Sequence, residues 1–195
     1  MKRIIILILV MILAAAIAGC ASDENNYTKE QEAQVTQEQK PTEDTESTEY
    51  DFGAKTALEK KEFTIEEMLE YAIQDEYLAR QEYELIMDEY GEQKPFSNII
   101  KAEENHIEML KGIYAKYDYD IPEDNAIDYA VLPNSLEEAF DIGVQAEIDN
   151  IAMYELFLEA ELPDDIRAVF IELRDGSKNH LAAFEKGVRG NGRNG

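Results

Sequence analysis

The chain has 195 residues, of which 43 are acidic and 18 basic, and its formal net charge is −25. This length fits one folded domain with appended segments. The acidic excess argues against a nucleic acid partner, because phosphate binding needs clustered lysine and arginine, and it favours cations instead. Cys20 is the single cysteine, so the chain can build neither an internal disulfide nor a cysteine-ligated metal centre. A bound metal would need oxygen and nitrogen ligands.

Residues 1–19 have the three-part pattern of an export signal, with two basic residues, an apolar run from Ile4 to Ala18 and small residues before Cys20. The run is shorter than the roughly 20 apolar residues of a membrane-spanning helix. The segment that ends at Cys20 resembles the lipobox at which bacterial-type lipoproteins are cleaved and lipidated. An uncleaved short anchor is the alternative. Both predict an extracytoplasmic protein attached to the cell membrane, with membrane lipid bound through Cys20 in the first case.

Two further segments have the composition of unfolded chain. Residues 20–58 are polar and carry few branched apolar side chains, so they are predicted to form a disordered tether. Residues 189–195 are rich in glycine and asparagine and are predicted to be a flexible tail. The folded domain is therefore expected at residues 59–188.

Helical periodicity fills most of that domain. Thr64 with Glu67, and Ser135 with Glu138, have the spacing of capping boxes, which mark helix starts. Gly91 and Pro163 are expected to mark helix ends. The helices are predicted at about residues 64–91, 95–117, 135–162 and 164–187.

The loop lengths predict the topology. Short loops after the first and third helices imply two antiparallel hairpins. The connection at residues 118–134 is long enough, at ~3.3 Å per residue, to run the whole length of a bundle. We therefore expect an all-α fold, a ferritin-like four-helix bundle of two hairpins joined by a long crossover.

The two hairpins also repeat each other in sequence. Shifting the chain by 71 residues places Glu76 on Glu147 and Tyr83 on Tyr154, and a shift of 74 residues places His106 on His180. The composition includes only these two histidines, and both occupy the same place in the repeat. The chain thus has the pattern of a duplicated helical hairpin.

Polar residues interrupt the apolar stripe of every predicted helix, part way along its length. They are Glu76, Glu103 with His106, Glu147, and Ser177 with His180. Buried carboxylates need a compensating charge, which a divalent metal ion would supply. Residues three apart share a helix face, so Glu103 and His106 can reach one ion. A hydrogen-bonded Glu–His network, or side chains on a flank that reach solvent, is the alternative.

These motifs resemble the ferritin and rubrerythrin superfamily, in which Glu-x6-Tyr on one helix precedes Glu-x-x-His on the next. The likeness runs from about residue 64 to residue 184, and its closer match is an uncharacterised branch of ferritin-like domains of unknown function. The resemblance implies a carboxylate-bridged di-iron site. Its ligands would be Glu76 and Glu147 at the two ends, Glu103 as a bridge, and His106 and His180 as nitrogen ligands.

The sequence departs from that pattern at Ser177, where the superfamily has a second bridging glutamate, and at Asn150, where another carboxylate is usual. Asn and Ser oxygens can complete a coordination shell but bring no charge. We therefore expect one ion to be held firmly and a second loosely. Tyr83 and Tyr154 are expected to be hydrogen-bond partners of the ligands, or simple packing residues.

Three functions fit these observations. The first is a non-haem iron or manganese oxidoreductase that reduces peroxide or oxygen, or oxidises ferrous iron, and takes electrons from an external donor. The second is a non-catalytic metal binder at the cell surface. The third is a structural or interaction bundle whose metal site is vestigial.

Overall fold

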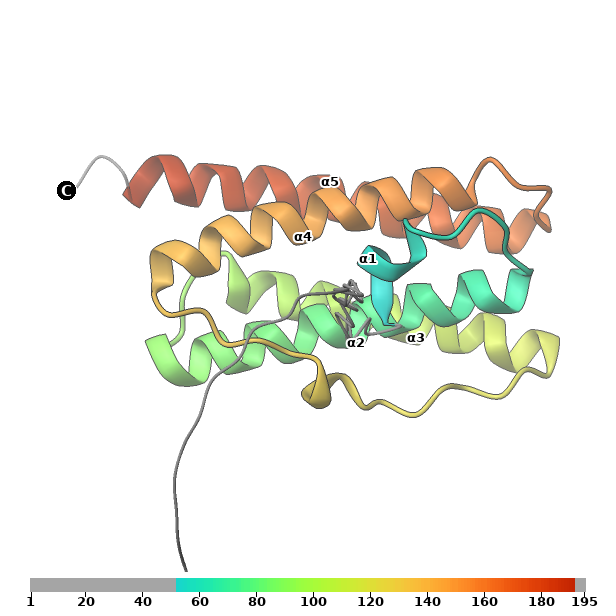
Figure 1. Ribbon diagram of the computed structural model, residues 1–195, viewed down its shortest axis with the longest axis horizontal. Coiled ribbons are helices and arrows are strands. Elements are labelled where there is room, and N and C mark those ends of the chain that lie inside the picture. The colour runs from blue at the N-terminus through green and yellow to red at the C-terminus, as the bar shows by residue number, and fades with distance from the viewer. Residues whose placement is uncertain (1–51, 192–195) are drawn as a thin grey trace, which may run out of the picture. The chain divides into compact units, whose positions relative to one another are not determined.

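The computed structural model describes residues 52–191, which are entirely helix, turn and loop. Cys20, the predicted export signal and most of the predicted tether lie outside the described residues. Four long helices form an all-α bundle, which confirms the predicted fold class (Figure 1). They are α2 (Ile65–Tyr90), α3 (Phe96–Tyr117), α4 (Leu136–Phe157) and α5 (Asp164–Asn191), preceded by the short α1 (Gly53–Ala57). No helix in this part of the chain is long and apolar enough to cross a membrane.

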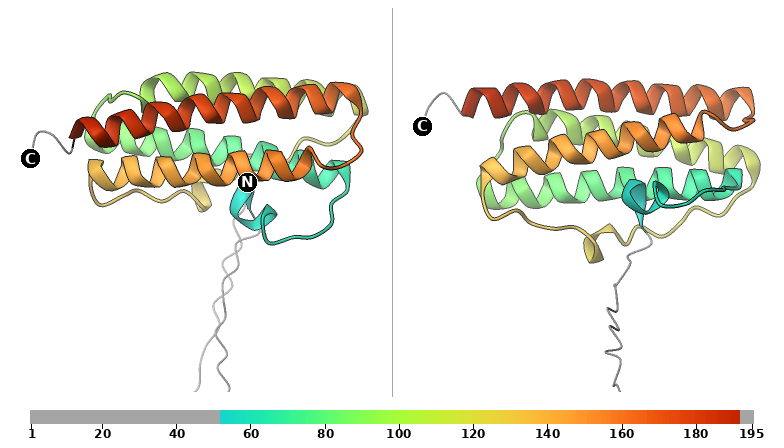
Figure 2. Two further views of the ribbon diagram at one scale, coloured as in Figure 1. Left: turned by 90° about the horizontal axis from the view of Figure 1, so that it is seen from above. Right: turned by 45° about the horizontal axis from the view of Figure 1, so that its top comes forward.

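The helices pair as two antiparallel hairpins, α2 with α3 and α4 with α5 (Figure 2). The crossover between them runs lengthwise along the bundle and contains a short 3-10 helix, η1 (Ala126–Asp128), that packs on α2. Side chains of α2 fix this crossover. Arg80 forms an ion pair with Asp124, and the hydroxyl of Tyr90 donates to the carbonyl of Pro133 at 2.6 Å.

Local sequence explains most helix ends. Thr64 and Glu67 form the complete capping box at the start of α2. At the start of α4 the hydroxyl of Ser135 accepts from the amide of Glu138, but the carboxylate of Glu138 accepts from Asn134 instead, so the predicted second box is half formed.

Two predicted helix ends differ from the structure. α4 ends at Phe157, six residues before Pro163, and the guanidinium of Arg167 binds the carbonyls of Leu158 and Ala160 just beyond it. α5 continues past Gly187 to Asn191. Gly187 lies inside this helix and serves packing, since a Cβ there would overlap the ring of Phe140 on α4.

The predicted boundary at residue 58 also differs from the structure. Residues Gly53–Ala57, assigned above to the tether, form α1, and Ala54 and Ala57 are buried against α2 and α4. Phe52 stacks on Tyr129 of the crossover with ring centroids 4.2 Å apart. Small apolar side chains, one aromatic ring and backbone hydrogen bonds to Gln74 and Asp75 dock this segment, although its composition is polar overall.

The interior consists of two apolar clusters at different levels of the bundle. The larger includes Leu69, Leu110, Phe157 and Phe170, and the smaller is built around Phe96 and other aromatic rings. Along every long helix the buried polar residues fall between the two clusters. They are Glu76, Glu103, His106, Glu147, Asn150, Ser177 and His180. A polar layer thus crosses the middle of an otherwise apolar core.

Candidate metal site

The five predicted ligands come together in this polar layer, one or two from each long helix. Glu76 lies on α2, Glu103 and His106 on α3, Glu147 on α4 and His180 on α5. All five are buried, from 1% exposed for Glu76 to 7% for His180. The two imidazole rings stack with centroids 5.6 Å apart. Helix packing therefore joins the equivalent histidines of the two hairpins.

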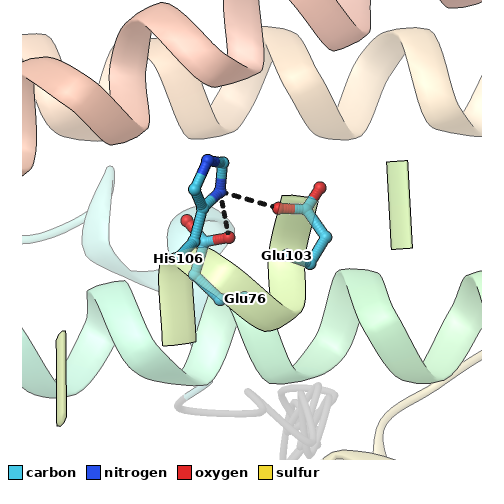
Figure 3. Close-up of side chains that lie close together, drawn as sticks. All are labelled: Glu76, Glu103 and His106. Carbon is cyan, nitrogen blue, oxygen red and sulfur yellow. Dashed lines mark hydrogen bonds and ion pairs between the residues drawn. The ribbon is translucent and has the colours of Figure 1, made fainter. Parts of the chain in front are cut away.

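Glu103 lies between the two histidines. Nδ1 of His106 is 2.9 Å from Oε2 of Glu103 and 3.0 Å from Oε2 of Glu76 (Figure 3). Nδ1 of His180 is 3.1 Å from the other oxygen of Glu103 and 3.5 Å from Oε1 of Glu147. Each oxygen of Glu103 thus faces a different histidine, and the Nδ1 atom of each histidine also faces a second carboxylate.

Two clusters of possible ligand atoms result. Glu76, Glu103 and His106 form one, and Glu103, Glu147 and His180 form the other, with the ligand atoms of each cluster within 4.8 Å of one another. These buried acidic and histidine groups can hold a metal ion. A carboxylate shared by two clusters is the arrangement that bridges a pair of ions.

Two tyrosines hold the outer carboxylates. The hydroxyl of Tyr154 on α4 donates to Oε1 of Glu76 at 2.7 Å, and the hydroxyl of Tyr83 on α2 donates to Oε1 of Glu147 at 3.1 Å. Tyr83 on α2 thus binds the glutamate of α4, and Tyr154 on α4 binds the glutamate of α2. The two hydrogen bonds are equivalent in the repeat. The contacts are hydrogen bonds, so neither tyrosine is a simple packing residue.

The protein groups leave one donor of the site unsatisfied. Nδ1 of His180 is within ion-pair distance of Glu103 and Glu147, but it has no hydrogen-bond partner among the described residues. A buried polar atom without a partner is costly. The same nitrogen, when deprotonated, suits a metal ion as a ligand.

Burial and charge shift the pKa values of the site strongly. Burial, together with the neighbouring charge of Glu103, raises the pKa of Glu76 to about 8. Burial likewise raises the pKa of Glu147 to about 7. Burial alone would raise the pKa of Glu103 as well, but the two adjacent imidazoles lower it to about 2.

The pKa values of the two histidines shift in the direction opposite to the one that burial alone would cause. Burial favours their neutral form, but the surrounding carboxylates raise the pKa of both His106 and His180 to about 10. Without metal the site therefore retains protons at neutral pH. Those protons balance the carboxylate charge that a divalent cation would otherwise balance.

Ser177 and Asn150 lie beside the clusters and bind each other. The hydroxyl of Ser177 donates to Oδ1 of Asn150, 2.6 Å away, or to the carbonyl of Leu173 at 3.0 Å. The amide of Asn150 donates in turn to the carboxylate of Asp75 on α2. Burial raises the pKa of Asp75 to about 6.

Sequence reasoning did not single out Asp75. A signal was available, because the repeat places Asp75 opposite Ala146. Gly176 also contributes, since a Cβ at this position would lie 2.7 Å from Cε1 and Nε2 of His106. The absence of a side chain there lets the His106 ring lie against α5.

A family model described as "Uncharacterized protein domain (DUF2202)" matches residues 65–194. The chain belongs to this family. The matched range contains α2 to α5 and every residue of the candidate site, whereas α1 lies before it. None of the curated proteins matches the chain.

Among solved structures, the DUF2202 bundle is similar to the crystal structure of hypothetical protein MJ0754 from Methanococcus jannaschii DSM 2661. The two chains are 24% identical, and the match covers 68% of this chain and 85% of the archaeal one with a TM-score of 0.58. At this identity the likeness supports the fold alone.

Proposed function

We propose that this DUF2202 protein binds divalent first-row transition metal ions, iron or manganese, in a site bridged by Glu103. The ligands would be Glu76 and His106 for one ion and Glu147 and His180 for the other. The observation that carries the proposal is the position of Glu103, whose two oxygens each face the Nδ1 atom of a different buried histidine. Carboxylate and imidazole ligands without thiolate suit these metals.

A metal-free Glu–His network satisfies the hydrogen-bonding capacity of His106 better than that of His180, whose Nδ1 contacts Glu103 and Glu147 only as ion pairs. Nδ1 of His106 has hydrogen bonds to two carboxylates, whereas the equivalent atom of His180 has none among the described residues. A network built for its own hydrogen bonds would be expected to satisfy both rings. A metal ion between the carboxylates would use both nitrogens in the same way.

The resemblance to the ferritin and rubrerythrin superfamily extends the proposal to redox chemistry. Iron held by three carboxylates and two imidazoles retains open positions and can exchange electrons with oxygen or peroxide. Tyr83 and Tyr154 would hold the outer carboxylates in place, and the apolar clusters above and below would exclude water. With a single cysteine in the chain, electrons would come from an external donor.

We also propose that the protein works outside the cytoplasm, attached to the cell membrane through lipid on Cys20. The support is the pattern of residues 1–20 described above. The long polar segment that follows would let the bundle stand away from the membrane surface.

Metal content tests the proposal. Full-length protein purified without chelator is expected to contain iron or manganese, and the His106→Gln/His180→Gln variant is expected to contain little of either. Oxygen and peroxide are then added to the ferrous-loaded protein. Oxidation with turnover supports the oxidoreductase, metal without turnover supports a non-catalytic binder, and protein that takes up neither metal supports the structural bundle.

A further inference from the structure

Asp75, Asn150 and Ser177 form a hydrogen-bonded chain at the edge of the metal site, and all three depart from the internal repeat. In the equivalent positions of the other hairpin, the repeat has an apolar residue opposite Asp75 and Asn150 and a glutamate opposite Ser177. The pairs are Asp75 with Ala146, Asn150 with Ala79, and Ser177 with Glu103. α5 thus lacks a carboxylate at Ser177, and α2 carries an extra one at Asp75. Asp75 and Ser177 both form hydrogen bonds with Asn150.

The hydrogen bonds fix the orientation of the Asn150 amide. A carboxylate only accepts hydrogen bonds, so Asp75 requires the NH2 group of Asn150 to face it. Oδ1 of Asn150 is then the atom that faces Ser177, 2.6 Å away. The other oxygen of Asp75 accepts from the backbone amide of Ala54 in α1 at 2.7 Å, which holds the carboxylate from its outer side.

The oxygen of the Ser177 hydroxyl also has lone pairs available to a metal ion. It has one proton and two acceptors within reach, Oδ1 of Asn150 and the carbonyl of Leu173. Within the described residues nothing donates to its lone pairs. Ser177 is one turn before His180 on α5, and Asn150 is one turn after Glu147 on α4, so both share a helix face with a proposed ligand.

We propose that Asp75 is a positioning residue for the metal site. By holding the amide of Asn150, it keeps the Asn150 carbonyl and the Ser177 hydroxyl available as neutral oxygen ligands. This inference rests on the proposed metal-binding function. It adds that Asp75, which is not itself a ligand, acts on the site through Asn150.

A double-mutant cycle tests the inference on the full-length protein, with manganous ion titrated by calorimetry. Asp75→Asn permits the Asn150 amide to turn over, because an asparagine at position 75 can offer either an oxygen or an NH2 group. Loss of an outer hydrogen-bond partner of a metal site typically lowers affinity by about 10–100-fold. We expect a decrease in this range for the more weakly bound ion in Asp75→Asn and in Asn150→Ala, and no further decrease in the double variant.

Controls separate positioning from general destabilisation. Gln74→Ala removes the side-chain oxygen that accepts from the amide of Gly53, and it leaves in place the hydrogen bonds of Asp75 to Ala54 and Asn150. It is expected to leave manganese affinity within about twofold. Thermal unfolding of every metal-free variant shows whether the bundle remains folded.

The outcomes distinguish the inference from the proposed function. Wild type that takes up neither manganese nor ferrous iron would refute the metal site itself. Wild type that binds while Asp75→Asn binds equally well would refute only the role of Asp75. Independent, multiplicative losses in the double variant would also refute it, because Asp75 would then act by a route other than Asn150.

Discussion

Gly176 of α5 and His106 of α3 are in contact where the two hairpins meet. A Cβ at position 176 would lie 2.7 Å from both Cε1 and Nε2 of the His106 ring, on the side opposite the nitrogen that faces Glu76 and Glu103. The ring therefore has α5 backbone on one side and carboxylates on the other. Its position depends on the absence of a side chain at one residue of the neighbouring hairpin.

Gly176→Ala is expected to push His106 toward the carboxylates and to lower manganese affinity by about tenfold or more. Overpacking should also cost about 1–3 kcal/mol of stability, partly offset by the better helix propensity of alanine. Calorimetric titration and thermal unfolding measure the two effects.

Gly112→Ala on α3 is the matched control, because a Cβ there has nothing within 4 Å. It is expected to raise stability by about 0.5–1 kcal/mol without changing affinity, and equal binding by both variants would contradict the role of Gly176.

Removing the tyrosine hydroxyls should destabilise the metal-free protein. Tyr83→Phe and Tyr154→Phe each take a buried hydrogen bond from a carboxylate, at an expected cost of about 1–3 kcal/mol in chemical denaturation. Tyr114→Phe provides the comparison, since the buried Tyr114 hydroxyl has no hydrogen-bond partner among the described residues. That variant is expected to be as stable as wild type or more stable. A similar loss in all three would mean that the hydrogen bonds to Glu147 and Glu76 are not the source of the stability that the hydroxyls contribute.

Metal binding should release protons. His106 and His180, with pKa values raised to about 10 by the surrounding carboxylates against burial, are protonated at pH 7 and must lose their protons to bind an ion. Affinity is therefore expected to rise between pH 6 and 8. Calorimetry at pH 7 in two buffers of different ionisation enthalpy measures the number of protons released. The same apparent enthalpy in both buffers would contradict this charge state.

The same shifts make the metal-free protein more stable at low than at high pH. A histidine whose pKa rises on folding contributes stability fully below its unfolded pKa of about 6.5 and loses it as the pH approaches 10. The raised pKa values of Glu76 and Glu147 also lower the stability of the folded state as the pH rises. The lowered pKa of Glu103 has the opposite effect, but only below the pKa of this group in the unfolded chain. The melting temperature should fall from pH 6.5 to pH 9.5, and His106→Gln/His180→Gln should flatten this slope. A melting temperature that rises over this range would show that other groups dominate.

Ser177→Glu restores the carboxylate that the superfamily pattern has at this position. Because a bridging carboxylate contributes charge to both ions, wild type is expected to bind nearer to one ion per chain and the variant nearer to two. Ferrous or manganous titration measures both stoichiometries, with His106→Ala as the control for loss of the site. Two equally tight ions in wild type would show that the neutral oxygens of Asn150 and Ser177 are sufficient.

Cys20→Ala tests the anchor. If lipid on Cys20 holds the protein, the variant should leave the membrane fraction or accumulate unprocessed, while the bundle folds as before. Fractionation followed by mass measurement of the amino terminus distinguishes these results. Processing and membrane association like those of wild type would contradict lipidation at this residue.

The sequence by itself determined the four long helices, the crossover and the identity of the five clustered groups. These follow from local patterns: apolar periodicity, the Thr64 capping box, and two histidines at equivalent places in a repeat. Such signals depend on residues a few positions apart or on self-similarity, both of which can be read without a structure. The helix at Gly53–Ala57 could not be read in this way, because its apolar contacts are with α2 and α4 and not within its own segment.

Only the tertiary structure decided how the site is supported. Asp75 contacts Asn150 across 75 residues of chain, and Gly176 makes room for His106 from another helix. The repeat marks Asp75 as unusual, and Gly176 is a glycine inside a helix, but neither signal says which residue of another helix is contacted. Their roles arise from which helix faces meet at the level of the polar layer, and that is set by packing among all four helices, not by any one segment.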